Sequence, residues 1–495
     1  MTATMRPVPV DAFPTITSTT QAETERVLFE HRPAECQPPM LDKKAHMNFL
    51  VRDLVQGFPA RYTSQDASQP WLIFWTLQSF SILQVGLDPG NKQRAIDMLM
   101  ACQHPGGGFG GGPKQAAHLL PTYAAVCALA IVGRAGDGGG WDQIDRTKMY
   151  EFFMSLKQPD GSFFVSKHSE VDVRGIYCLL VVATLLDIIT PELVEGTAAF
   201  IASCQTYEGG FSSASQPYYS PNANGPSSLL GSPRPPLGEA HGGYTFCALA
   251  AWVMLQPFLP STSQTNPSID TKALVRWLVQ MQGIPVELGG FKGRTNKLVD
   301  GCYSWWVGGA FGLLESIGIN PAALASQEAP TPSEGDWDDI DDSLYNRKAL
   351  QEYILCAGQH PAGGLRDKPP KCTTNPSFIS GLILFLEGLT RTTLYTVFPA
   401  YPLRNTRWRL PSEKQKELES VWSGDNNDDG LRRRVFAQSL CFMQEEGTEK
   451  LVGGSENRVN ATHPIFNLTV THTDGIMAHF YKQPIPERNG GRKAA

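Results

Sequence analysis

An all-α fold built from stacked helical hairpins is predicted by a short turn that recurs along the chain. Each copy follows an apolar segment, contains Gln, and continues after a few residues into Gly-Gly-Phe or a close variant. The Gln residues of the five copies are Gln103, Gln158, Gln205, Gln282 and Gln359. The first three copies are spaced by roughly 50 residues, which fits one helical hairpin per copy, and the larger gaps contain insertions. Glycine permits the close chain reversal, and the aromatic ring can close the turn against a neighbouring helix.

The stretches between these turns support the same fold class, because their apolar residues recur with helical spacing. The clearest of them are Thr122–Val132, Arg174–Leu186, Tyr244–Leu255 and Tyr303–Ile317. Alternating Val, Ile and Thr residues, which are typical of strands, are scarce. The repeat alone leaves open whether the array of hairpins is open or closed.

Composition excludes several classes of function. The 495 residues carry a formal net charge of −6, so the basic surplus of a nucleic-acid-binding protein is absent. No transmembrane segment is expected, since apolar stretches such as Phe246–Leu255 are far shorter than the roughly 20 residues that cross a bilayer. The opening residues lack the apolar core of a signal peptide, and the ten cysteines lack the even spacing of a disulfide scaffold. Reduced thiols and a cytoplasmic location are therefore expected.

Longer strings at the turns indicate a family. They are Gly106–Pro113, Asp172–Tyr177, Glu239–Cys247 and Gly293–Trp306, with Asp66–Trp71 ahead of them. At these strings the chain resembles the protein prenyltransferase β-subunit family, and the farnesyl branch most closely. The resemblance covers Leu41–Lys371 and returns weakly over Asn460–Tyr481. It implies a closed α/α barrel (toroid) around an apolar funnel, and a heterodimer with an α subunit.

Domain boundaries follow from this resemblance and from composition. We expect a flexible tail at 1–40, the barrel at 41–389, a divergent segment of uncertain structure at 390–456, a return to the barrel at 457–485 and a tail at 486–495. Within the barrel, the stretches 212–238, 256–268 and 322–342 are interpreted as loop insertions; the first two are rich in turn-forming residues and the third ends in an acidic run.

A diphosphate site is predicted where two cations meet two further donors. Arg294 and Lys297 stand close enough in sequence to contact one polyanion, and His241 and Tyr303 each stand at the start of an apolar helix. Such groups stabilise the negative charge that grows on a departing diphosphate. Taken alone, the two cations would be an ordinary exposed basic turn. The resemblance implies that these four residues hold the head group of farnesyl diphosphate, together with their neighbours Gly242, Gly243, Tyr244, Thr295 and Asn296.

A zinc site is predicted at Asp300 and Cys302. Zinc accepts both a carboxylate and a thiolate, and catalytic zinc keeps one coordination position open. Without the resemblance, Asp300 would equally be a helix cap and Cys302 a buried thiol. The resemblance implies Zn²⁺ that holds the sulfur of an acceptor cysteine as thiolate, the acceptor being a protein with a C-terminal CaaX sequence.

The third zinc ligand of the family, a histidine shortly after Asp367–Lys371, is missing. No histidine occurs between His360 and His463. His360 follows Gln359 as His104 follows Gln103, so both are interpreted as residues of the repeat turn rather than as ligands.

The remaining site residues also come from the resemblance. Asp367 is expected to support Mg²⁺ beside the diphosphate, as a carboxylate suits a hard cation, and Lys371 is expected near the same head group. Arg174 is expected to contact the acceptor's C-terminal carboxylate. The apolar funnel is expected to be lined by Trp71, Trp75, Tyr177, Cys247 and Trp306. A bulky indole at Trp71 shortens such a pocket and favours farnesyl over geranylgeranyl.

Three alternatives stay open. A geranylgeranyltransferase β subunit is disfavoured by Trp71 and by the farnesyl-like string Thr295–Gly301. A terpene cyclase is suggested by Asp336–Asp339 and Asp338–Asp342, which fit D-x-D-D and D-D-x-x-D within one acidic insertion. A catalytically impaired barrel that binds only an α subunit is suggested by the missing histidine.

Overall fold

The computed structural model describes residues 13–33, 37–58, 60–216, 235–259, 267–319, 344–369, 408–420, 429–445, 449 and 451–484. These residues are mainly helical, with two small antiparallel two-stranded sheets, so the predicted all-α class is confirmed. Among the described helices, none combines the length and hydropathy needed to cross a bilayer.

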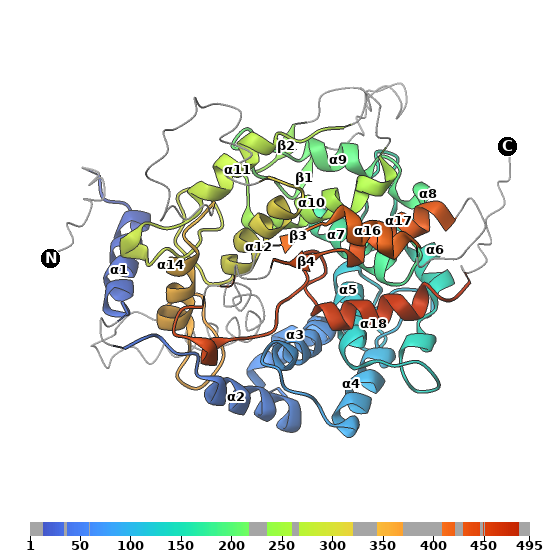
Figure 1. Ribbon diagram of the computed structural model, residues 1–495, viewed down its shortest axis with the longest axis horizontal. Coiled ribbons are helices and arrows are strands. Elements are labelled where there is room, and N and C mark those ends of the chain that lie inside the picture. Colours follow the sequence, from blue (N-terminus) through green and yellow to red (C-terminus); the bar gives the residue numbers. More distant parts are fainter. Residues whose placement is uncertain are drawn as a thin grey trace.

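An inner set of apolar helices surrounds the middle of the molecule (Figure 1). The set consists of α3 (Gln69–Ile82), α5 (Leu119–Val132), α7 (Val173–Leu185), α10 (Gly242–Leu255) and α12 (Tyr303–Ser316). Each helix packs on the next in this order. Nearly every residue of α5 and α7 is buried, as expected for helices that are apolar on all sides.

An outer set of helices alternates with the inner one along the chain and lies toward the periphery in Figure 1. The outer helices are α2 (Lys43–Gln56), α4 (Pro89–Ala101), α6 (Arg146–Leu156), α8 (Pro191–Val194), α9 (Thr197–Ser203), α11 (Thr271–Gln280) and α14 (Arg347–Glu352). They bury one face only: α6 buries Met149, Phe152, Phe153 and Leu156. Several begin at an Asp or Asn whose side chain accepts from a backbone N–H of the first turn, as Asp145 does from Lys148.

The recurring turns join each outer helix to the next inner one. In each, a bridge closes the loop between its two sides, as between Gln205 and Phe211 and between Gln282 and Phe291. Both phenylalanine rings are fully buried. Gly209 has φ of 109°, and a Cβ there would lie 2.1 Å from the backbone oxygen of Ala273, so this turn requires glycine. The predicted role of the repeat is therefore confirmed at these turns.

The prediction of a flexible tail at 1–40 is wrong for part of that segment. Helix α1 (Ile16–Glu30) begins with a capping box between Thr15 and Ser18 and buries Val27 and Leu28. Gln21 Nε2 donates to Glu287 Oε1 at 2.8 Å. A long-range contact thus orders a helix whose own apolar pattern is weak.

Two of the predicted insertions contain regular secondary structure at their ends. The strand β1 (Ala214–Ser215) pairs with β2 (Pro236–Leu237) at the ends of the first, and a 3₁₀ turn, η4 (Gln256–Phe258), opens the second. Residues 217–234, 260–266 and the whole of 322–342 lie outside the described part of the chain. The other short elements are η1 (Ala60–Ser68), η2 (Trp141–Gln143), η5 (Pro285–Glu287), η8 (Ser455–Asn457) and a π-helical turn, η6 (Tyr353–Gly358).

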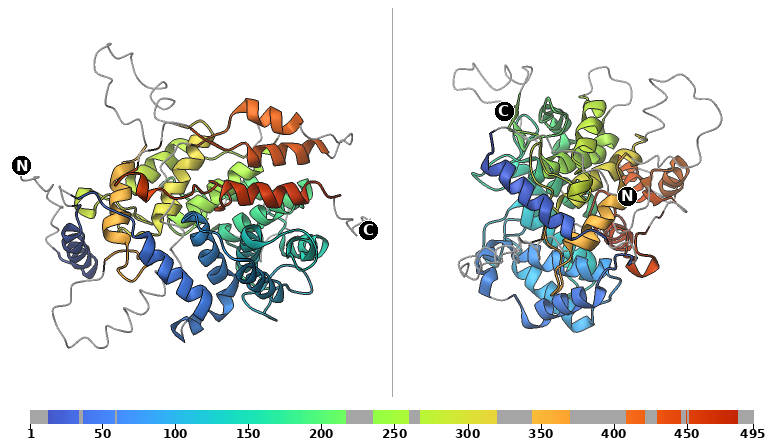
Figure 2. Two further views of the ribbon diagram at one scale, coloured as in Figure 1. Left: turned by 60° about the horizontal axis from the view of Figure 1, so that its bottom comes forward. Right: turned by 90° about the vertical axis from the view of Figure 1, so that its left-hand side faces the viewer.

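The segment that the sequence left uncertain, 390–456, contains regular structure where it is described. The strand β3 (Trp408–Arg409) pairs with β4 (Met443–Gln444), and helices α16 (Ser412–Ser420) and α17 (Asp429–Leu440) lie between them in sequence. Figure 2 shows α16 and α17 beside α18 (Val470–Phe480) along one side of the molecule.

The C-terminal segment returns to the inner helices. Three successive carbonyl oxygens accept hydrogen bonds from side chains of these helices. Tyr177 Oη donates to Ile465 at 2.7 Å, and Tyr123 Oη donates to Phe466 at 3.2 Å. Gln78 Nε2 donates to Asn467 at 2.9 Å. These donors belong to α7, α5 and α3. The turn before α18 is therefore seated against three inner helices at once.

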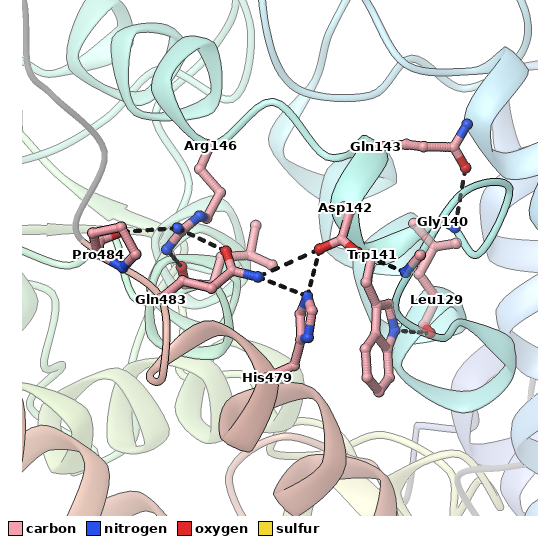
Figure 3. A network of polar contacts seen from close by, with 11 residues as sticks. Leu129, Gly140, Trp141, Asp142, Gln143, Arg146, His479, Gln483 and Pro484 are labelled. Atoms are coloured by element: carbon pink, nitrogen blue, oxygen red, sulfur yellow. Dashed lines mark hydrogen bonds and ion pairs between the residues drawn. The ribbon is translucent and has the colours of Figure 1, made fainter. Parts of the chain in front are cut away.

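Polar contacts fasten the far end of α18 to the barrel (Figure 3). His479 Nε2 lies 2.7 Å from Asp142 Oδ1, and Arg146 Nη2 donates to Gln483 Oε1 at 3.0 Å and to the carbonyl oxygen of Pro484 at 3.1 Å. The Trp141 ring lies beside that of His479, with centroids 5.2 Å apart and the planes tilted by 42°.

Candidate functional site

The predicted polar residues lie at the N-terminal ends of neighbouring inner helices. Arg174 lies in the first turn of α7, His241 caps α10, and Cys302 caps α12. The backbone N–H of Gly242 donates to the carbonyl oxygen of Gly293 at 2.8 Å, which joins the start of α10 to the turn before α12. Segments far apart in sequence thus form one polar rim around the ends of apolar helices.

His241 is a neutral hydrogen-bond donor. Its Nδ1 accepts from the backbone N–H of Gly243 at 3.0 Å, so the ring hydrogen of the neutral form resides on Nε2, which lies 3.1 Å from Tyr303 Oη. Burial, followed by the charges of Arg294 and Arg174, lowers the pKa of His241 to about 4. The phenol oxygen of Tyr303 therefore accepts from the imidazole.

The turn that carries the predicted cations packs closely on Tyr303. A Cβ at Gly293 would lie 1.8 Å from Cζ of that ring, so only glycine fits. Asn296 takes φ of 59°, which asparagine tolerates better than most residues. Arg294 forms an ion pair with Glu239, and Lys297 is exposed on the same turn. The two cations and Tyr303 accordingly share one short segment.

Arg174 is held as a cation beside His241. Its guanidinium donates three hydrogen bonds to Asp172, at 3.1, 3.1 and 2.6 Å, and lies 5.1 Å from the Tyr244 ring centroid. Burial by itself lowers the pKa of Arg174, but Asp172 outweighs it and the net pKa is raised. The ring of Tyr244 lies 4.7 Å from that of His241.

Asp300, Cys302 and Asp367 form a second polar group beside the first. The backbone N–H of Cys302 donates to Asp300 Oδ1 at 2.9 Å, and that of Gly301 donates to the carbonyl oxygen of Asp367 at 2.7 Å. Burial, then Asp300, and to a smaller extent Asp367, raise the pKa of the Cys302 thiol well above its usual range. Thiolate and carboxylate are ligand types that a divalent cation accepts, and a cation bound here would offset the negative charge and favour the thiolate.

The structure brings together two of the expected zinc ligands. Among the described residues, no group of three His, Cys, Asp or Glu side chains has the geometry to hold a metal ion. Lys371 and the region where a third ligand is expected lie outside the described residues. His360 is a turn residue, as predicted: its Nδ1 accepts from Ala362 at 3.1 Å, as His104 Nδ1 accepts from Gly106 at 3.0 Å.

Aromatic rings form a continuous arc across the inner helices below this rim. Consecutive ring centroids along the arc lie between 5.2 and 5.7 Å apart. The rings are those of Trp75 and Trp71 on α3, Tyr123 on α5, Tyr177 on α7, Phe246 on α10 and Trp306 on α12. Cys247, next to Phe246, is buried as well. Aromatic side chains of this kind are typical of sites that bind an apolar chain.

Sequence reasoning missed four residues that belong to this arrangement: Tyr123, Phe246, Glu208 and Glu239. Tyr123 and Phe246 stand at the fifth position of their helices, as Tyr177 does, and that shared position is a signal that could have found them. Glu208 accepts from Thr295 Oγ1 at 2.7 Å. Thr295 was expected to contact the diphosphate, and its hydroxyl instead donates to this carboxylate. The Asp336–Asp342 motifs lie outside the described residues.

Comparison with known proteins agrees with this architecture. The model of the prenyltransferase alpha-alpha toroid domain matches residues 41–468. Candida albicans protein geranylgeranyltransferase-I complexed with GGPP has a similar fold, with a TM-score of 0.52 and 18% identity over 90% of this chain and 99% of that one. This likeness concerns the fold alone.

Curated relatives define the branch. Protein farnesyltransferase subunit beta of Pyricularia oryzae is 36% identical over 67% of this chain, and the match spans 60% of that protein's length. The corresponding Schizosaccharomyces pombe subunit is 36% identical over 72% of this chain and 80% of its own length. The geranylgeranyl transferase type-2 subunit beta of Candida albicans is 27% identical over 56% of this chain. With its inner helices, polar rim and matched toroid domain, the chain belongs to the prenyltransferase family, within the group of protein farnesyltransferase β subunits.

Proposed function

We propose that this chain transfers farnesyl from farnesyl diphosphate to the cysteine thiol of proteins that end in a CaaX sequence. It would act in the cytoplasm as the β subunit of a heterodimer with an α subunit. The names of the relatives support this assignment, and the eight cysteines among the described residues are free thiols, as a reducing compartment requires.

The observation that carries the proposal is the adjacency of Cys302 and Tyr303. The first is a candidate metal ligand, and the second contacts His241 in the anion-binding rim. An acceptor sulfur near Cys302 and a diphosphate near Tyr303 would thus be neighbours, with the farnesyl chain on the aromatic arc. Proximity of this kind removes much of the entropic cost of joining two reactants.

The proposed reaction is a displacement at the first carbon of the farnesyl chain. The acceptor sulfur forms a bond to this carbon as the bond to the diphosphate oxygen breaks, and the electron pair leaves with the diphosphate. His241, Arg294, Lys297 and Tyr303 would stabilise the charge that develops on the leaving group. Zn²⁺ held by Asp300, Cys302 and a third ligand would keep the acceptor sulfur deprotonated at neutral pH. Asp367 would contribute to Mg²⁺ binding beside the diphosphate.

Farnesyl is favoured over geranylgeranyl by the packing of Trp71. Its ring lies 5.2 Å from Trp75 and 5.5 Å from Tyr123, which fills one end of the arc with bulky side chains. The lower identity to geranylgeranyl transferase subunits points the same way.

A second candidate function is a barrel that binds the diphosphate and the α subunit without transferring the prenyl group. The sequence favours this alternative, because no histidine occurs between His360 and His463 to serve as the third zinc ligand. It differs from the main proposal in lacking bound zinc and, as a consequence, prenyl transfer.

The test is to purify the chain with a farnesyltransferase α subunit and to measure both zinc content and transfer to a CaaX peptide. We expect one zinc per heterodimer and faster transfer from farnesyl than from geranylgeranyl diphosphate. Faster transfer from geranylgeranyl diphosphate would show that the chain is a geranylgeranyltransferase β subunit. Diphosphate binding without zinc and without transfer would instead establish the impaired barrel.

A further inference from the structure

Glu239 engages one of the two cations of the proposed diphosphate site. It stands two residues before His241, and its carboxylate pairs with Arg294. The two side chains are 50% and 37% exposed, so ions in solution reach them. Exposed pairs of this kind contribute little net stability, and an incoming anion can therefore exchange with the carboxylate.

The position of the turn does not depend on this ion pair. Glu208 Oε1 accepts from Thr295 Oγ1 at 2.7 Å, while its Oε2 accepts from the backbone N–H of Ala240 at 3.3 Å. Gly242 N–H also donates to the Gly293 carbonyl oxygen at 2.8 Å. Glu208 and the backbone thus hold the turn at the start of α10. The ion pair of Glu239 with Arg294 is therefore not needed to position the turn.

We propose that Glu239 is an internal competitor of the diphosphate for Arg294. In the empty site it pairs with the guanidinium; the bound diphosphate replaces it, and it returns to Arg294 as the diphosphate product leaves. Its negative charge weakens diphosphate binding and so favours product release. The inference rests on the proposed function in taking a diphosphate as the ligand of this rim.

The test uses inorganic pyrophosphate and the intact heterodimer, with binding measured by calorimetry. Glu239→Gln keeps the size of the side chain and removes its charge. We expect pyrophosphate to bind on the order of 3- to 10-fold more tightly to this variant, and the gain to shrink as salt is added. Unchanged or weaker binding would overturn the proposal.

Two controls separate competition for Arg294 from a general effect of charge. Glu195→Gln changes the net charge equally at the outer helices and should leave pyrophosphate affinity unchanged. In an Arg294→Gln background, Glu239→Gln should bring no further gain, because the contested partner is gone. An equal gain in that background, or with Glu195→Gln, would contradict competition.

These measurements need neither a prenyl chain nor an acceptor, so they are independent of farnesyl transfer. A tightened pyrophosphate complex without transfer would support the role of Glu239 and reject the proposed reaction. Failure of the unmodified heterodimer to bind pyrophosphate would reject both.

Discussion

The imidazole of His241 illustrates how backbone contacts decide the chemistry of a single side chain. The string Glu239–Cys247 predicted a donor at this position, and the structure adds its protonation state, because Gly243 N–H occupies Nδ1. The pairing of Arg294 with Glu239 could not be predicted in the same way. The pairing depends on the path of two turns that are separate in sequence. The sequence shows only that Glu239 is the one acidic residue in the string Glu239–Cys247.

Replacing Tyr303 with Phe tests the phenol. The change removes the oxygen that lies 3.1 Å from His241 Nε2 and keeps the ring that packs on Gly293. We expect kcat to fall roughly 10- to 100-fold, since one donor to the developing charge is lost, while KM for farnesyl diphosphate changes little. Steady-state kinetics of the heterodimer measure both. An unaltered kcat would show that the phenol takes no part in the reaction.

Replacing Lys297 with Ala tests the exposed cation of the turn. Turnover and diphosphate affinity should both fall, because the departing charge loses one counter-charge. The fold should stay intact, as the side chain is exposed. Kinetics and thermal melting of the same preparation check the two expectations. Kinetics equal to those of the unmodified protein would remove Lys297 from the mechanism.

At the scale of the elements, the repeat turns account for most of what the sequence could predict. The apolar stretch at Tyr303–Ile317, for example, forms α12 within a residue of its expected end. Helix α1 was missed because its stability comes from contacts such as Gln21 with Glu287, which no local pattern reveals. The pairing of β1 with β2 was missed for the same reason, since it joins the two ends of an insertion.

Two glycines near α12 provide a matched comparison of close packing. Gly293→Ala places a Cβ 1.8 Å from the Tyr303 ring, whereas a Cβ at Gly308 has its nearest neighbour, Phe291, at 3.7 Å. We expect Gly293→Ala to destabilise the fold by roughly 1–3 kcal/mol and to weaken pyrophosphate binding. Gly308→Ala should leave stability equal or raise it, because alanine favours a helix. Thermal melting and calorimetry distinguish the two; equal behaviour would mean that the turn does not pack on Tyr303.

At the scale of the whole molecule, the C-terminal turn connects residues that no sequence pattern relates. The fold class followed from the repeat, but the hydrogen bonds from Gln78, Tyr123 and Tyr177 to the 465–467 backbone are contacts of very long range. His463, in the same turn, is buried against the carbonyl oxygen of Ser439 at 2.8 Å. Because the folded protein keeps this buried histidine neutral, protonation at low pH is expected to destabilise the turn.

Stability is expected to fall as pH is lowered from about 6.5 toward 3. Burial lowers the pKa of His463 to about 3, so over this range the unfolded chain binds a proton that the folded chain does not. The loss from this residue is on the order of 3 kcal/mol by pH 4, and His241, with a pKa of about 4, adds to it.

Urea unfolding across this pH range measures the effect. His463→Asn should flatten the pH dependence, even where it lowers stability at neutral pH. His168→Asn, at an exposed histidine with φ of 61° that asparagine also tolerates, should leave the slope unchanged. A slope that survives His463→Asn would show that other groups govern acid unfolding.

The proposed function depends most on the rim and the aromatic arc binding the two ends of one ligand. A crystal structure of the heterodimer with farnesyl diphosphate measures this directly. We predict the diphosphate within hydrogen-bonding distance of His241, Arg294 and Tyr303, with the farnesyl chain against Trp71 and Tyr177. A diphosphate bound elsewhere, or a farnesyl chain outside the inner helices, would contradict the account.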